Sequence, residues 1–245
     1  MNANCSPEHS NAIVAYLDRY LTISIENPLD LFYLIENVEK GRRQFCMDVR
    51  DLLKYFEFLN LFDENSLIRY RKVVKIPRAN TDNFVPEDRK VVSAFNKIED
   101  KNYRLVYKLL VYSGIRLREA VYLLNNYAED RIITNGVIAK YPLSLERKTK
   151  KVYYAYMPEE FSYEVKRLDL KEPTVRQHIA RRQLASKYLR KWQYNFLISN
   201  GVPESVADYI QDRAPSTVGS MHYLAKTQQA DIWYARVVPR LLKIF

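Results

Sequence analysis

The chain of 245 residues suffices for one large or two modest domains, and with 47% hydrophobic residues it is not globally disordered. Its net charge of +10 favours a polyanionic partner, although a merely basic surface gives the same composition. The 2 cysteines and 3 histidines lack metal-ligand spacing and no phosphate-binding loop is present, so we expect neither a metal nor a nucleotide cofactor.

The N-terminus, "MNANCSPEHS", has no basic region followed by an apolar run, so we expect no signal peptide. No stretch of about 18 consecutive apolar residues follows, so we expect no membrane contact. The cysteines also form no disulfide framework, which suits a reducing compartment. The predicted location is therefore the cytoplasm.

The first domain is predicted to be all helical and to span residues 1–75. Apolar residues recur at helical spacing over 8–21, 28–40, 47–62 and 64–74. The stretch 75–90 then carries two prolines and several turn-formers, and residues 76–85 within it are the predicted linker.

The second domain, predicted over 86–245, is mixed α+β but mostly helical. Helical periodicity covers 86–98, 103–112, 117–126, 158–168, 174–199, 203–212 and 226–243. Between these, residues 131–158 are rich in β-branched and aromatic residues, with Asn135-Gly136 as a turn signal. We interpret that stretch as a small antiparallel sheet or hairpin, with a half-buried strand over 152–157.

Four patterns in the second domain suggest chemistry. In "YSGIRLREAVYLL" (112–124), Arg116 starts a helix, where free backbone N–H groups already favour an anion. The alternative is an ordinary ion pair with Glu119.

In "LERKTKKVYYAYM" (145–157), a basic cluster falls near the hairpin tip, either as a solvated turn or as a contact with DNA phosphates. That cluster is Arg147, Lys148, Lys150 and Lys151.

The third pattern is the helix "QLASKYLRKWQYNFLI" (183–198). An apolar stripe runs along one face, and Lys187 and Arg190 lie three residues apart on another face. They either present two cations to a common point or belong to an exposed basic face. The fourth pattern is "DRAPSTVGSMHYLAK" (212–226), in which Arg213 follows a helix and Tyr223 lies near the end of a short segment that Pro215 opens.

Together these patterns resemble the tyrosine recombinase (phage-type integrase) family. "SGIRLRE" is similar to its first box, with Arg116 as the catalytic arginine and Glu119 as the acidic partner. Lys148 best matches the hairpin lysine, although Lys150 or Lys151 also fits. "KYLR" resembles the third box, with Lys187 in place of histidine and Arg190 as the second arginine. "QDR" stands where the family has Leu-Gly-His, so that Arg213 aligns with the family's histidine.

"HYLAK" then supplies Tyr223 as the nucleophile, while Tyr234 lies too far beyond Arg213. The two departures, lysine and arginine for histidine, resemble integrases of archaeal viruses and plasmids. The resemblance covers about 86–225. By position alone, it implies that the N-terminal helices form a DNA-clamping domain.

The resemblance implies that Tyr223 attacks a phosphodiester and forms a 3′-phosphotyrosyl bond, with no cofactor. Arg116, Arg190 and Arg213 stabilise the charge that develops on the phosphate. Lys148 protonates the 5′-hydroxyl leaving group, and Lys187 acts electrostatically. The implied partners are double-stranded DNA and further copies of the chain in a tetramer, in which the C-terminal helix docks on a neighbour or on its own domain. Two alternatives are a type IB topoisomerase-like enzyme and a non-catalytic DNA-binding protein.

Overall fold

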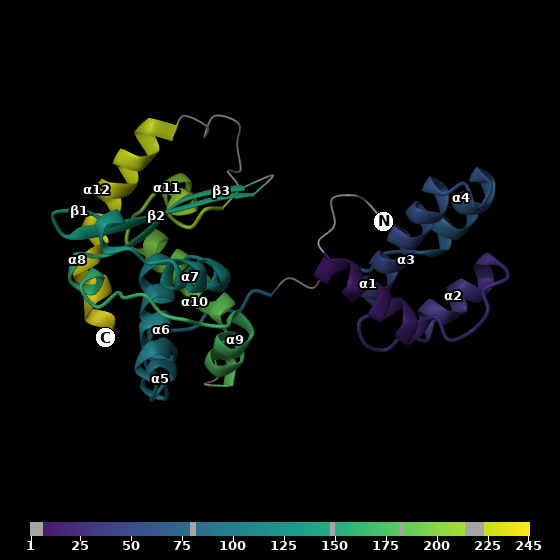
Figure 1. Ribbon diagram of the computed structural model, residues 1–245, viewed down its shortest axis with the longest axis horizontal. Helices are drawn as coiled ribbons and strands as arrows, with labels where there is room; N and C mark the ends of the chain where they lie inside the picture. Colours follow the sequence, from purple (N-terminus) through teal and green to yellow (C-terminus); the bar gives the residue numbers. More distant parts are fainter. Residues whose placement is uncertain (1–6, 79–81, 148–149, 182–183, 214–222) are drawn as a thin grey trace. The chain divides into compact units, whose positions relative to one another are not determined.

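The computed structural model describes residues 7–78, 82–147, 150–181, 184–213 and 223–245. The chain divides into two compact units, Met1–Asp82 and Asn83–Phe245, here called unit 1 and unit 2. Figure 1 shows helices throughout both units and one small sheet in unit 2. This architecture confirms the predicted fold class.

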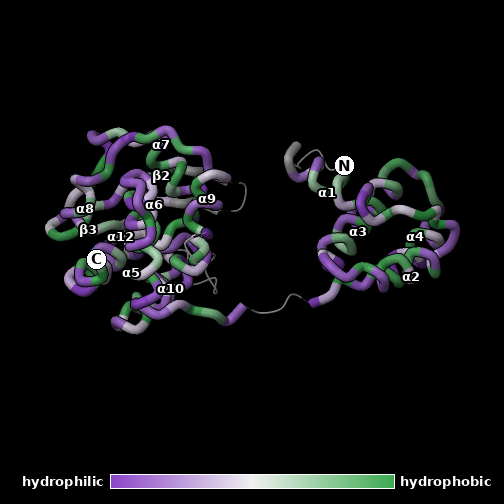
Figure 2. The backbone as a smooth tube through the Cα atoms, turned by 90° about the horizontal axis from the view of Figure 1, so that it is seen from below, coloured by the Kyte–Doolittle hydropathy of each residue, from purple (hydrophilic) through white to green (hydrophobic). Residues whose placement is uncertain are grey.

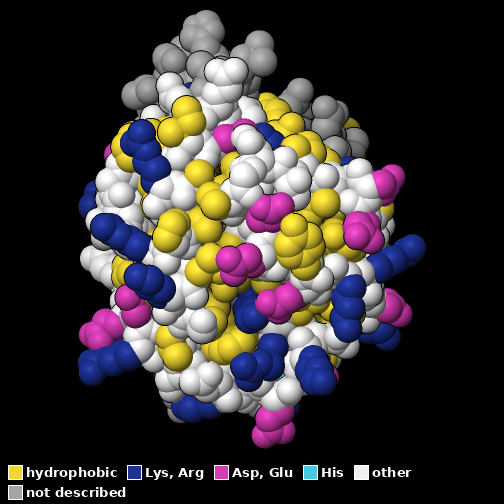
Figure 3. Space-filling model, turned by 90° about the vertical axis from the view of Figure 1, so that its left-hand side faces the viewer, with side chains coloured by type: hydrophobic (Ala, Val, Ile, Leu, Met, Phe, Trp, Pro, Cys, Tyr) yellow, Lys and Arg dark blue, Asp and Glu magenta, His cyan; other side chains and the backbone are white. Residues whose placement is uncertain are grey.

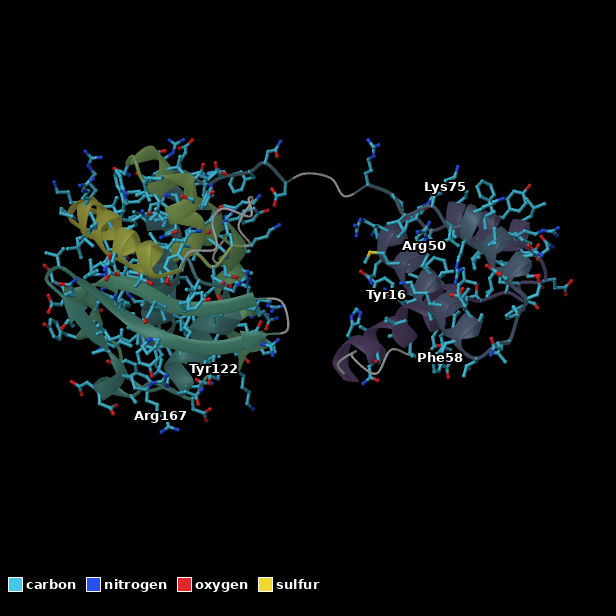
Figure 4. All side chains as sticks on the ribbon, turned by 90° about the horizontal axis from the view of Figure 1, so that it is seen from above. Tyr16, Arg50, Phe58, Lys75, Tyr122 and Arg167 are labelled. Carbon is cyan, nitrogen blue, oxygen red and sulfur yellow. The ribbon has the colours of Figure 1, made fainter. Side chains whose placement is uncertain are left out.

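Unit 1 is built from α1 (Pro7–Tyr20), α2 (Pro28–Glu36), α3 (Arg42–Phe58) and α4 (Glu64–Val73). Green and purple alternate along these helices in Figure 2, as amphipathic helices require. Their apolar faces meet in a core that includes Leu31, Phe45, Leu53 and Leu67. The Nε of Arg50 donates to the carbonyl of Val74, which fixes the end of α4 to α3 (Figure 4).

The third helix starts earlier and ends earlier than the predicted 47–62. Phe45 and Cys46 are fully buried and extend the apolar face back to Arg42. At the other end the chain turns at Asn60, whose φ of 53° is incompatible with a continuing helix.

Unit 2 begins with α5 (Asp88–Asn96), α6 (Lys101–Ser113) and α7 (Leu117–Asn125), followed by a short 3₁₀ turn, Glu129–Arg131. The sheet follows, with strands β1 (Ile133–Asn135), β2 (Ile138–Arg147) and β3 (Lys150–Pro158) in the order β1-β2-β3. All neighbours are antiparallel, and Gly136, with φ 69°, makes the predicted turn between β1 and β2.

Over residues 155–157, strand β3 is buried on both faces, whereas its alternating sequence predicts a half-buried strand. Ala155, Tyr156 and Met157 are all at most 1% exposed. Helix α6 packs on the sheet from one side, and α12 (Tyr223–Leu241) lies across it in Figure 4. Because helices cover both faces, consecutive strand residues are buried.

The remaining helices are α8 (Glu159–Ser162), α9 (Glu172–Arg181), α10 (Ser186–Ser199), α11 (Glu204–Ile210) and, after α12, a 3₁₀ turn at Leu242–Ile244. The predicted helix over 158–168 is wrong beyond Ser162. After it the chain runs along the end of α7, where the N–H of Leu168 donates to Leu124 and that of Leu170 to the side chain of Asn125.

The single helix predicted over 174–199 is also wrong, because α9 and α10 are separate. Ala185 is extended, with φ −67° and ψ 148°, and forms the N-cap of α10. Both helices pack on α6 and on each other. Helix α12 begins at Tyr223, three residues before the predicted start, so Tyr223 opens this helix rather than ending the preceding segment.

One face of unit 2, shown in Figure 3, mixes basic, acidic and apolar side chains. The net charge of +10 is therefore not spread as a uniform basic coat on this face. Within the described ranges, no helix has both the length and the apolar character needed to cross a membrane.

Candidate functional site

Arg116 occupies the bend between α6 and α7. Gly114 ends α6 in the left-handed conformation (φ 63°), and Arg116 is the N-cap of α7. Glu119 accepts the backbone N–H of Arg116 at 2.8 Å and its Nη1 at 2.7 Å. The Glu119 side chain is 0% exposed and that of Arg116 is 28% exposed, so this ion pair is partly buried rather than a surface pair.

The loop after α11 brings Asp212 to the same arginine. Nη1 of Arg116 donates to Oδ2 of Asp212 at 3.0 Å, and Nη2 donates to the Asp212 carbonyl at 3.2 Å. Burial opposes the charge of Arg116, but its bonds to Glu119 and Asp212 together raise its pKa. The pKa of Asp212 is also raised, because burial outweighs the contact with Arg116. The guanidinium is therefore fixed in place and fully charged.

Arg190 reaches the same bend from α10. Its Nη1 donates to the carbonyl of Gly114 at 2.8 Å and its Nη2 to the carbonyl of Gln211 at 2.5 Å. Burial, and next the nearby charge of Arg116, lower the pKa of Arg190 to about 10. Such a shift marks a cation held in a poorly solvated place beside like charges, a frequent property of anion-binding sites.

Two buried glutamines support the site, and sequence reasoning missed both. Nε2 of Gln211 donates to Oε1 of Gln193 at 2.5 Å and to the Arg190 carbonyl at 2.8 Å. Gln193 in turn donates to the carbonyl of Tyr112 at 3.3 Å. Both side chains are 0% exposed. The only sequence signal was a polar residue on the otherwise apolar face of α10.

Arg213 also joins the group. Its Nε donates to Oε1 of Gln211 at 2.9 Å, and its guanidinium carbon lies 3.9 Å from the centre of the Tyr194 ring. The charge of Arg213 contributes to the lowered pKa of Arg190. The structure thus brings Arg116, Arg190 and Arg213 together around the ends of α6 and α11. We refer to these three side chains as the arginine cluster.

The structure describes the side chain of Lys187 but not those of the lysines predicted at the hairpin tip. Lys187 is exposed, with its Nζ 4.6 Å from the centre of the Tyr188 ring, so it differs in burial from Arg190 on the same helix. Lys148 lies outside the described residues. Arg147 and Lys150 are paired across β2 and β3, and Lys151 is opposite Glu146. These positions put the basic cluster at the hairpin end, as predicted; its side chains lie outside the description.

Tyr223 is the first residue of α12, and its side chain lies outside the described part. One helical turn later, a hydrogen bond of 2.6 Å joins the hydroxyl of Thr227 to that of Tyr209 on α11. Tyr209 lies two residues before Gln211, so this bond connects the start of α12 to the element that carries part of the arginine cluster.

The rest of α12 is held on its own unit. Nζ of Lys140 donates to Oδ2 of Asp231 at 2.5 Å, and the hydroxyl of Tyr156 donates to Oδ1 at 3.0 Å. Tyr234 is 0% exposed and donates to the carbonyl of Tyr112 at 2.9 Å, and burial raises its pKa well above the ordinary value. A phenol in that position is unsuited to attack an external phosphate.

Among the apolar residues of the C-terminal helix and the turn after it, Val237 and Leu241 are buried within unit 2 and Leu242 is partly buried against its core, whereas Ile232 is 55% exposed. The side chain of Leu224 is not described. Among the described residues, no group of histidine, cysteine, aspartate or glutamate side chains is arranged to hold a metal ion.

Residues 83–240 match a family model described as archaeal phage integrase. No curated protein matches the chain. Among solved structures, the XerH site-specific recombinase bound to its difH substrate is similar with a TM-score of 0.55 and 14% identity, covering 89% of this chain and 76% of that one. At this identity the likeness concerns the fold alone.

Two further solved structures are similar over nearly the whole chain. The integrase from mycobacterium phage Brujita has a TM-score of 0.49 and 12% identity, covering 98% of this chain and 92% of that one. The XerA recombinase has a TM-score of 0.41 and 13% identity, covering 96% of each chain.

Proposed function

Because the chain belongs to the archaeal phage integrase family, we propose that the arginine cluster holds the phosphate of a DNA strand while Tyr223 attacks it. The chain is a site-specific recombinase of the tyrosine type, a class that cleaves and rejoins DNA through a phosphotyrosyl intermediate. What remains to be assigned is which residues do this, on what partner, and with what outcome for the DNA.

The observation that carries the assignment is the convergence of Arg116 and Arg190 at the carbonyl ends of α6 and α11. Guanidinium groups bind phosphate oxygens in pairs, and fixed cations stabilise the charge that grows on those oxygens during attack. Burial, and next the nearby charge of Arg116, lower the pKa of Arg190. A phosphate between them would relieve that repulsion.

In the proposed reaction the hydroxyl oxygen of Tyr223 bonds to phosphorus, and the 5′-oxygen of the next nucleotide leaves. Lys148 at the hairpin tip gives that oxygen its proton, with Lys150 and Lys151 as alternatives. The product is a 3′-phosphotyrosyl bond, which keeps the energy of the phosphodiester, so the reverse reaction joins strands without ATP. Lys187 contributes positive charge.

The proposed partner is double-stranded DNA, on which four copies of the chain act together to integrate or excise a mobile element. Unit 1 would serve as the DNA-clamping domain, and Arg147, Lys150 and Lys151 would contact the DNA backbone. The proposed location is the cytoplasm of a host cell, in association with the nucleoid. A steep loss of DNA affinity with added salt is expected, because phosphate contacts release counterions.

A suicide substrate tests the proposal. A nicked duplex that carries the recognition site is incubated with the protein, and a DNA adduct that survives denaturation is expected. A Tyr223→Phe protein should form none, whereas a Tyr122→Phe protein, which loses an exposed hydroxyl elsewhere in unit 2, should react normally. An adduct with Tyr223→Phe would refute the choice of nucleophile.

The same assay separates the alternatives. A non-catalytic DNA-binding protein would bind the duplex and yield no adduct with the wild-type chain. A topoisomerase-like enzyme would form the adduct and relax supercoiled DNA, but would never join two sites. Recombination between two sites on one plasmid is the result expected here.

A further inference from the structure

Asp212 occupies a backbone position that favours glycine. Its φ of 53° places it in the left-handed region, directly after the C-cap of α11. Its N–H donates to the carbonyl of Tyr209 at 3.1 Å, and the N–H of Arg213 donates to Asp208 at 2.8 Å. These two bonds form a Schellman motif, in which glycine usually takes this position. The backbone alone therefore gives no reason for an aspartate.

The carboxylate of Asp212 is engaged with Arg116. It shares Nη1 of that arginine with Glu119, while its own carbonyl takes Nη2. The Glu119 side chain is 0% exposed and also accepts the backbone N–H of Arg116, the N-cap of α7, so it is part of the helix start. The Asp212 side chain is 13% exposed and is the partner nearer to solvent.

A carboxylate and a phosphodiester are the same kind of ligand for a guanidinium group. Both are anions with two oxygens that accept from its N–H groups. A phosphate bound at Arg116 and Arg190 would lie close to the Asp212 carboxylate, and like charges in a partly buried site repel each other strongly.

We propose that Asp212 competes with the scissile phosphate for Arg116 and thereby weakens binding of that phosphate at the site. This inference rests on the proposed function of the arginine cluster. In the protein without DNA, Asp212 satisfies Arg116 and offsets part of the cluster's charge. When the phosphate enters, the carboxylate has to give up Nη1 or tolerate a second anion beside it.

A purely supporting role for Asp212 predicts the opposite sign. If the carboxylate only holds Arg116 in position, its removal slows cleavage. If it competes, removal of its charge speeds cleavage. The direction of the effect therefore separates the two roles.

The test uses two variants of the full chain and a matched control. Asp212→Asn keeps the size, tolerates the left-handed backbone and removes the charge. Asp212→Gly suits the backbone best. Glu204→Gln removes one negative charge from the start of the same helix, α11. Each protein is assayed for its Kd with intact duplex and for its rate of adduct formation on the nicked duplex.

We expect cleavage rate divided by Kd to rise about tenfold for Asp212→Asn and to rise for Asp212→Gly, with Glu204→Gln unchanged within about twofold. On a duplex whose scissile phosphate is replaced by an uncharged methylphosphonate, the gain should disappear. Wild-type adduct formation with no gain in either variant would overturn this inference alone, as would an equal gain on the uncharged linkage. Failure of the wild-type protein to form any adduct would refute the proposed function as well.

Discussion

A methyl group added at Gly114 should displace the buried glutamines that support the arginine cluster. The Cβ of an alanine there would lie 2.4 Å from Oε1 of Gln193 and 2.6 Å from Nε2 of Gln211. Neither side chain can swing into solvent, because both are 0% exposed and bonded to each other. The carbonyl of Gly114 is also a direct partner of Arg190, so any backbone shift moves the arginine.

The size of the effect follows from three contributions. The left-handed backbone costs alanine about 1 kcal/mol. Overpacking a tight interior costs about 1–3 kcal/mol. Separating the Gln193–Gln211 hydrogen bond leaves a buried amide group unpaired, which costs about 1–3 kcal/mol. A Gly114→Ala protein should therefore lose roughly 3–7 kcal/mol of unfolding free energy and most of its cleavage activity.

Gly136 provides the matched control. Its φ of 69° resembles the 63° of Gly114, but nothing lies within 4 Å of an added Cβ. A Gly136→Ala protein should lose only the backbone contribution, about 1 kcal/mol of unfolding free energy. Thermal unfolding followed by circular dichroism should place the melting temperature of Gly114→Ala roughly 5–15 °C below that of Gly136→Ala. Equal melting temperatures would refute the claim that the glutamine pair requires glycine here.

Three other outcomes are expected. An Arg190→Ala protein should lose cleavage by about 10²- to 10³-fold while its Kd for DNA changes far less; equal losses in adduct and binding assays would point to a binding role alone. Removing the hydroxyl of Tyr209 or of Thr227 should slow cleavage about fivefold without changing the Kd, because the start of α12 then loses its link to α11; additive losses in the double variant would contradict a shared bond. Burial raises the pKa of Asp48 in unit 1, so the folded state binds this proton more tightly than the unfolded state and loses stability as the pH rises above the ordinary value of 3.8. Asp48→Asn should stabilise unit 1 by about 1 kcal/mol at pH 7 in calorimetry, and destabilisation at that pH would disprove the sign.

The elements that sequence reasoning placed well are those with a local signal. The Asn135-Gly136 turn joins β1 and β2, because glycine adopts the left-handed backbone that such a turn needs. Asn-Pro before α2 provides both an N-cap and an N1 proline. The order of the motifs along unit 2 also predicted the family, which the match over 83–240 confirms.

Elements without a local signal were placed less well. The stretch between α9 and α10 contains neither glycine nor proline, so only packing of the two helices on α6 and on each other separates them. The chain after Ser162 has helical composition, but the N–H groups of Leu168 and Leu170 donate to residues at the end of α7. In both cases distant partners outweighed a weak local preference.

The resemblance of the sequence motifs to those of tyrosine recombinases predicted Arg116, Arg190 and Arg213 as the phosphate-binding cations, whereas residue type and spacing alone left the role of each arginine open. The tertiary structure alone decided that their side chains meet, since they come from three separate elements joined by the carbonyls of Gly114 and Gln211. It also revealed the buried glutamines and the carboxylate of Asp212 among these cations. Periodicity along one helix reports which face is buried, but the partners across that face depend on how the helices pack.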